Sequence, residues 1–153
     1  SGSEPAFLGD RARTVREIER HLDDCQYGEV EIMETVQRLI ELNLLNDAAF
    51  AEEFVHTRLA AKPVSRAHLR EQLLGHELPR EVVDAALAAV PDEAEREHAC
   101  AVAEKYLRQF AGMEEEQRDA RACKRVLARG FDFDTARAAL ETAKARMSAE
   151  EHA

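Results

Sequence analysis

Basic side chains recur at helical spacing along a chain that is otherwise strongly acidic. The 153 residues include 21 Lys and Arg against 31 Asp and Glu, which gives a net charge of −10. Residues three or four apart share one face of an α-helix, although Pro63 breaks the helix between Lys62 and Arg66. These side chains form strips of cations suited to phosphates or carboxylates of a partner. The candidate partner-binding residues are Arg58, Lys62, Arg66, Arg70, Arg118, Arg121, Arg125 and Arg129.

A third basic strip near the N-terminus is formed by Arg11, Arg13, Arg16 and Arg20. The competing interpretation is that each strip is a solvated face paired with nearby carboxylates. Recurrence once per repeat favours the functional interpretation. We therefore expect that replacing Arg66 and Arg70 by Glu weakens the protein's inhibition of its partner. The melting temperature should stay nearly unchanged.

The elements that must position these strips are helices. Aromatic residues make up only 5% of the chain, Trp is absent, and Ala, Leu, Glu and Arg are abundant. These four are strong helix formers, whereas runs of β-branched residues are scarce. The composition predicts an all-α protein.

An internal repeat organises the helices. The stretch 73–87 returns as 126–140 at a constant offset, with Leu74 at the place of Leu127 and Ala85-Ala86-Leu87 at that of Ala138-Ala139-Leu140. Repeats of this length indicate tandem three-helix repeats forming an elongated, curved array. We expect an N-terminal tail with an expression scar at 1–10, a first repeat at 11–45 that is shorter and partial or looser, repeats at 46–90 and 92–146, and a C-terminal tail at 147–153.

Capping residues predict the helix boundaries. Asn46 and Ser65 are expected N-caps, Asp132 or Asp134 caps the last helix, and Asp92 to Glu95 forms a capping box. Gly75 and Gly130 are expected to take positive φ and end the helices before them. In the first repeat, an apolar stripe of Ile32, Val36, Leu39 and Ile40 is expected to face the core.

Catalysis, metals and membranes find little support in the sequence. No catalytic or phosphate-binding motif is present, the six His are scattered, and the three Cys lack a C-x-x-C pair. No apolar run approaches the roughly 18 residues of a membrane span, and no signal peptide is visible. We expect a cytoplasmic protein that is not an enzyme and has no cofactor, metal or membrane contact.

The order of three motifs resembles the RecX family of bacterial regulatory proteins. Leu45-Asn46-Asp47-Ala48-Ala49-Phe50-Ala51 is similar to the family's Leu-Asp-Asp-x-x-Phe-Ala segment, Arg58 falls where the family has Arg, and Arg129-Gly130-Phe131 matches an Arg-Gly-Phe turn. The resemblance spans nearly all of 11–145. The chain departs from the family pattern at Ser65, His68, Gln72 and His76-Glu77, where Gly, Arg, Glu and a Lys-Gly turn are expected.

RecX proteins are arrays of three-helix repeats that bind RecA filaments on single-stranded DNA. They lodge in the filament groove, limit filament growth and suppress ATPase activity and strand exchange. The resemblance implies this role here, with the RecA filament as partner and weak contact with single-stranded DNA; we expect a monomer. The alternatives are a stand-alone helical DNA-binding protein and a generic helical-repeat adaptor.

Overall fold

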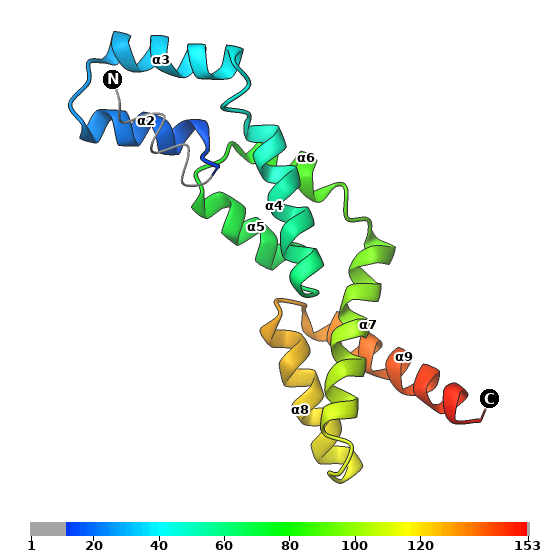
Figure 1. Cartoon of the computed structure of the whole chain (residues 1–153). Helices are drawn as coiled ribbons and strands as arrows, with labels where there is room; N and C mark the ends of the chain where they lie inside the picture. The colour runs from blue at the N-terminus through cyan, green and yellow to red at the C-terminus, as the bar shows by residue number, and fades with distance from the viewer. Residues whose placement is uncertain (1–11, 153) are drawn as a thin grey trace. The chain divides into compact units, whose positions relative to one another are not determined.

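The computed structural model describes residues 12–152, and this range contains eight α-helices and no β-strand (Figure 1). The all-α prediction and the array of helical repeats are confirmed. Arg11 lies outside the described residues. The helices are α2 (Val15–Asp24), α3 (Glu29–Glu41), α4 (Asp47–Ala61), α5 (Arg66–Gly75), α6 (Arg80–Leu87), α7 (Asp92–Gln109), α8 (Glu115–Ala128) and α9 (Phe133–Glu151).

The chain divides into two compact units. Residues up to 56 together with 71–86 belong to unit 1, and 57–70 together with the residues from 87 onward belong to unit 2. The division passes through α4 and α5, so each of these helices contributes to both units.

In unit 1, α2 and α3 bury one apolar face each. Thr14 caps α2 in a capping box: its side chain accepts the Glu17 N–H, and the Glu17 side chain accepts the Thr14 N–H. The core side chains of this helix pair are Ile18, Leu22, Val36, Leu39 and Leu45. Ile40, which was expected to face this core, is instead 43% exposed.

In unit 2, α7 packs against both α8 and α9. Much of the buried surface is alanine, which lets helix backbones approach closely. Larger side chains such as Leu107, Val126 and Phe131 fill the remaining space. The buried alanines of this core are Ala99, Ala103, Ala122, Ala136, Ala139 and Ala143.

Three predicted caps are confirmed by their hydrogen bonds. The Asn46 side chain accepts the Ala49 N–H at 3.0 Å, and Ser65 Oγ accepts the His68 N–H at 3.0 Å. Asp132, rather than Asp134, caps α9 and accepts the Thr135 N–H at 2.8 Å. That hydrogen bond from the Thr135 backbone holds the pKa of the Asp132 carboxyl below its ordinary value. The last helix then runs to Glu151, beyond the residue where we expected the C-terminal tail to begin.

Two predictions about helix ends are wrong in part. Gly75 is the last residue of α5, but the positive φ of 60° expected there belongs to Glu77. Asp92 and Glu95 form no capping box, because the N-cap of α7 is Pro91 and the Glu95 carboxylate accepts the backbone N–H of Arg66 instead. A tertiary partner thus replaced the local one.

A residue of positive φ follows each of the helices α2, α5 and α8. Gln26, Glu77 and Gly130 have φ values of 69°, 60° and 95°. Only the last of these is glycine, as was predicted for Gly130. The repeated backbone conformation at these three turns is therefore not revealed by residue types alone.

Candidate partner-binding surface

The turn between α8 and α9 is fastened to the segment that precedes α5, within unit 2. The Ser65 N–H donates to the Arg129 carbonyl at 3.0 Å, and the Arg129 guanidinium donates to the Pro63 carbonyl at 2.8 Å. We call this contact the unit 2 joint. One donor of the Arg129 guanidinium is therefore used within the fold and is not available to a partner.

Gly130 is required at this joint for two reasons. Its φ of 95° is a conformation that residues with a side chain rarely adopt. A Cβ atom there would also collide with Ser65 Oγ and would lie 2.9 Å from His68 Cβ. Two departures from the family pattern, at Ser65 and His68, therefore lie directly against the matching Gly130 turn.

A corresponding joint in unit 1 fastens the turn after α5 to the start of α2. Thr14 Oγ1 donates to the His76 carbonyl at 2.8 Å, and His76 Nδ1 lies 3.0 Å from a Glu17 carboxylate oxygen. Glu77 pairs with Arg16 and Arg20. The departure at His76-Glu77 thus supplies the polar contacts of this joint.

The first candidate strip is divided between structural and exposed positions. Arg66 donates to the Val90 carbonyl at 3.0 Å and to Asp92 at 2.8 Å, and its Nε lies 3.7 Å from Glu95. This network ties the start of α5 to the start of α7 within unit 2. It neutralises the Arg66 charge and leaves little for a partner.

The other members of that strip differ in exposure. Arg58 and Lys62 are exposed, and Arg70 is half-buried. Arg58 and Arg70 both interact with other groups of the chain. Lys62 forms no ion pair with any residue from 12 to 152 and is the member of this strip most available to a partner.

The second candidate strip begins with an internal network between α8 and α9. Arg118 pairs with Asp119 at 2.9 Å, and Lys144 pairs with the same carboxylate at 2.8 Å. Burial alone would raise the pKa of Asp119, but the hydrogen bonds from Lys144 and Arg118 outweigh it and hold that pKa below its ordinary value. Arg118 is therefore a structural residue first.

Arg121 and Arg125, by contrast, are exposed and lie over aromatic rings of α7. The Arg125 guanidinium carbon is 5.2 Å from the Tyr106 ring centre and 6.0 Å from that of Phe110, and Arg121 is 6.0 Å from Phe110. The two rings stack with centroids 6.0 Å apart. Cation–π contact holds a guanidinium in place while leaving its N–H donors free for hydrogen bonds.

Lys105 completes a positively charged surface around these rings, with its ammonium 5.3 Å from the Tyr106 ring centre. Within the described part of the chain, neither Lys105, Arg121 nor Arg125 forms an ion pair. The Arg129 guanidinium, which donates to the Tyr106 hydroxyl at 3.3 Å, lowers the pKa of that phenol, and Lys105 and Arg125 act in the same direction. We call Lys105, Tyr106, Phe110, Arg121 and Arg125 the cation–aromatic surface.

Sequence reasoning found the arginines of this surface and missed Lys105 and both aromatic residues as site residues. Tyr106 and Phe110 are spaced i, i+4, and Arg121 and Arg125 repeat that spacing on α8. Matched spacing on two neighbouring helices was the signal available, but it required knowing that α7 and α8 lie side by side.

No group of three or more His, Cys, Asp or Glu side chains among residues 12–152 is placed to hold a metal ion. None of the helices in that range combines the length and apolar character needed to cross a bilayer. Burial raises the pKa of the Cys100 thiol, which disfavours its reactive thiolate.

Comparison with known proteins gives a consistent result. A family model described as the second three-helix domain of RecX matches residues 46–87. The regulatory protein RecX of Chlorobaculum tepidum is 30% identical over 86% of this chain and 79% of its own length. That of Prosthecochloris aestuarii is 29% identical over 88% of this chain and 87% of its own length.

The similarity extends to three-dimensional structure. The crystal structure of RecX from Lactobacillus salivarius superimposes with a TM-score of 0.79 at 22% identity, covering 91% of this chain and 90% of that one. Some relatives are longer: the chain spans 51% of the regulatory protein RecX of Bacillus subtilis. The match to the regulatory protein RecX of Chlorobium phaeobacteroides is 33% identical over 82 residues, which are 54% of either chain.

Proposed function

This chain belongs to the RecX family, and on that premise we propose that it binds RecA filaments on single-stranded DNA and lowers their ATPase and strand-exchange activity. The relatives are named regulatory proteins, so we propose that this chain acts without catalysis and in the cytoplasm. The division into repeats at 11–45, 46–90 and 92–146 is part of the proposal.

The cation–aromatic surface is the observation that carries the proposal. A protein with a net charge of −10 repels anionic surfaces at long range. Attraction must then come from a local group of cations that is not already neutralised. Arg121, Arg125 and Lys105 meet that condition, whereas Arg66 does not. We therefore place the main partner contact at α7 and α8.

Regulation through this surface follows from differential affinity. A bound protein shifts the filament toward a slowly hydrolysing or shortened state only by as much as it prefers that state. The Arg121 and Arg125 guanidinium groups offer planar, bidentate donors for carboxylates or phosphates that are correctly spaced in only one filament state. Such selectivity requires cations held in a defined position, and the rings of Tyr106 and Phe110 hold the Arg125 guanidinium in this way.

Titration of RecA ATPase activity tests the proposal. Filaments assembled on single-stranded DNA should hydrolyse ATP more slowly when the protein is present at less than equimolar amounts to RecA. Strand exchange should fall in parallel. Unchanged ATP turnover and unchanged strand exchange at equimolar protein would contradict the proposal.

Direct binding of single-stranded DNA is the second candidate, because Arg side chains over aromatic rings are also typical of sites that bind bases and phosphates. Affinity for naked single-stranded DNA, measured against salt, separates the two. A steep salt dependence with sub-micromolar affinity at physiological salt favours this candidate. Negligible binding to naked DNA favours the filament protein as the partner.

A further inference from the structure

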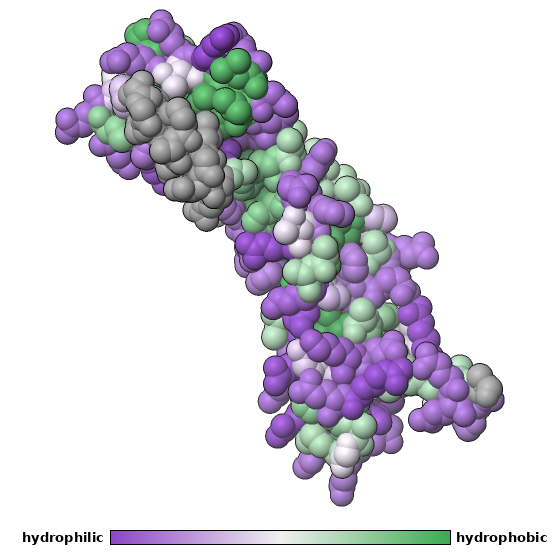
Figure 2. Space-filling view, in the orientation of Figure 1, coloured by the Kyte–Doolittle hydropathy of each residue, from purple (hydrophilic) through white to green (hydrophobic). Residues whose placement is uncertain are grey.

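Helix α3 exposes apolar side chains on a side that adjoins its own core face. Val30, Met33 and Ile40 are 61%, 65% and 43% exposed. Their spacing of i, i+3 and i+10 places them in one sector of the helix. Leu42 and Leu44, just past the helix, are 50% and 56% exposed, and Figure 2 shows apolar surface gathered over this end of α3. We call Val30, Met33 and Ile40 the α3 apolar face.

This face is peculiar to the first repeat. Aligning the positive-φ residues Gln26 and Gly130 brings α3 into register with α9. The positions of Val30, Met33 and Ile40 then correspond to Asp134, Arg137 and Lys144. These three positions are thus charged in α9 and apolar in α3. Contiguous exposed apolar side chains are typical of a docking surface.

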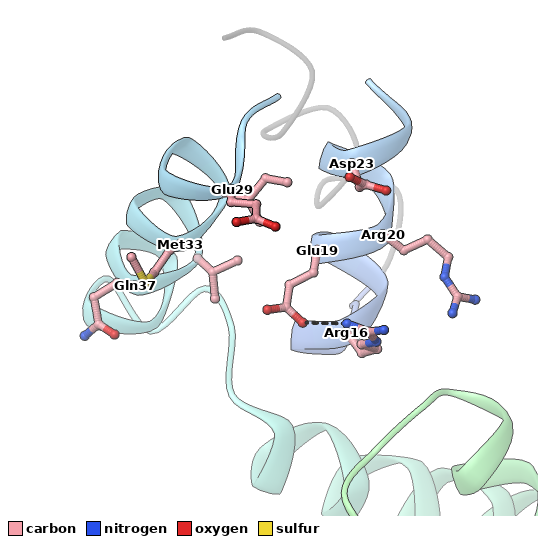
Figure 3. A pocket seen from close by; sticks show the side chains of 9 residues that line it. Arg16, Glu19, Arg20, Asp23, Glu29, Met33 and Gln37 are labelled. Atoms are coloured by element: carbon pink, nitrogen blue, oxygen red, sulfur yellow. Dashed lines mark ion pairs between the residues drawn. The ribbon is translucent and has the colours of Figure 1, made fainter. Parts of the chain in front are cut away.

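A groove of about 520 Å³ lies between α2 and α3 beside this face (Figure 3). Met33 belongs to both the groove and the α3 apolar face. Figure 3 shows Glu19 and Glu29 reaching into the space between the helices, whereas Arg20 extends away from α3. The groove therefore presents carboxylates next to apolar surface.

The cations beside the groove are already neutralised. Arg16 lies 3.6 Å from Glu19 and 3.6 Å from Glu77, and Arg20 pairs with Glu77. Asp23 and Glu29 form no ion pair with any residue that the structure describes. The charge left for a partner is consequently negative.

We infer that the α3 apolar face and its groove bind an amphipathic helix of a partner protein, one with aliphatic side chains along one face and Lys or Arg along its edges. The aliphatic side chains would cover Val30, Met33 and Ile40, and the basic ones would reach Asp23 and Glu29. Long basic side chains suit such an edge, because their apolar stems cover surface while their charged ends meet carboxylates. This contact differs in chemistry from the cation–aromatic surface and does not require that the partner be RecA.

Binding of two labelled model peptides, followed by fluorescence anisotropy, tests the inference. Both peptides have about 14 residues, the length that spans α3, and share one helical pattern of Leu. One carries Lys at the remaining positions, and the other carries Glu. The full chain should bind the Leu–Lys peptide at least about tenfold more tightly than the Leu–Glu peptide, a difference of one decade in Kd.

A Met33→Asp variant distinguishes a seated helix from general attraction to an acidic protein. Unspecific attraction would grow stronger with the added negative charge, whereas loss of the apolar contact should weaken binding of the Leu–Lys peptide by about tenfold. Phe133→Asp is the matched control, because Phe133 is an exposed apolar residue of α9 and the charge change is the same. It should leave peptide binding unchanged. Val30→Asp should repeat the Met33→Asp result.

Three outcomes would overturn the inference. The first is equal or tighter binding of the Leu–Lys peptide by Met33→Asp. The second is a dimer in sedimentation that Met33→Asp dissolves, which would assign the face to a second copy of the chain. The third is peptide binding that occurs only after residues 1–11 are removed, which would assign the face to the chain's own N-terminal segment.

Discussion

The two basic strips have similar spacing, and yet their arginines contact different groups. In the strip from Arg58 to Arg70, Arg66 is held by a carbonyl and two carboxylates. In the strip from Arg118 to Arg129, Arg121 and Arg125 lie over aromatic rings and form no ion pair with residues 12–152. What separates a structural arginine from a displayed one is the neighbouring helix, since a carboxylate neutralises the charge and a ring preserves it.

The second strip is itself mixed. Its outer members, Arg118 and Arg129, contact Asp119 and the Pro63 carbonyl, and its middle members are available. This distinction narrows the proposed partner contact to the middle of α8. The variants that follow test either the residues held by the fold or the residues available to a partner, beginning with the largest expected effect on stability.

The largest effect is expected at the unit 2 joint, which holds Arg129. Gly130→Val should lower the free energy of unfolding by about 3–5 kcal/mol, because a side chain there strains the backbone and collides with Ser65 and His68. Gly75→Ala is the control, since Gly75 lies in α5 and a Cβ there would meet no atom within 4 Å. That change should be neutral or stabilise the fold by up to about 1 kcal/mol. Chemical denaturation measures the free energy of unfolding of both variants. An equal loss in the two would show that the unit 2 joint does not require glycine at position 130.

The next effect is expected at Arg66. Arg66→Glu should lower the free energy of unfolding by about 2–3 kcal/mol, because it removes charged hydrogen bonds and sets like charges beside Asp92 and Glu95. The expectation from the sequence, that reversing this residue leaves melting unchanged, is therefore replaced. Lys62→Glu is the control and should change stability by less than about 0.5 kcal/mol. If the two variants melt at the same temperature, Arg66 is not a structural residue and is again a candidate for partner binding.

A smaller and pH-dependent effect is expected at Asp119. Its pKa is lowered in the folded state, so the contribution to stability is present above the ordinary carboxyl pKa and is lost as pH falls through the folded value. Asp119→Asn should destabilise the protein by about 1 kcal/mol at pH 7. The difference should shrink toward zero in melts below about pH 3. Glu141→Gln, an exposed residue of α9, should show no such trend.

The fold was largely predictable because its determinants are local. Asn46, Ser65 and Asp132 each cap a helix by accepting an N–H three residues away. The errors arose where a distant group competed with a local one. Glu95 accepts a bond from Arg66 instead of completing a box with Asp92, and Glu77 takes the positive φ expected of Gly75.

The candidate site was predictable only in part, because helical spacing gives the face of a helix but not what lies opposite it. Arg121 and Arg125 were identified as partner-binding candidates, yet nothing local distinguishes them from Arg66. That distinction depends on Tyr106 of α7, which is buried in the core of unit 2, and on Phe110, which packs against that core.

Only a small effect on stability is expected where the effect on function is greatest. Replacing Arg121 and Arg125 together by Glu removes two cation–π contacts on an exposed surface, a cost of about 1–2 kcal/mol in the free energy of unfolding. The double variant should remain folded, with helical content unchanged in circular dichroism. Lys124→Glu is the control for added negative charge on α8.

The most direct test is the amount of protein that halves RecA ATPase activity on single-stranded DNA. Compared with the natural chain and with Lys124→Glu, the folded Arg121→Glu, Arg125→Glu variant should require at least about tenfold more protein, equivalent to about 1.4 kcal/mol of lost binding. If the double variant inhibits RecA as well as the natural chain does, the cation–aromatic surface is not the partner contact.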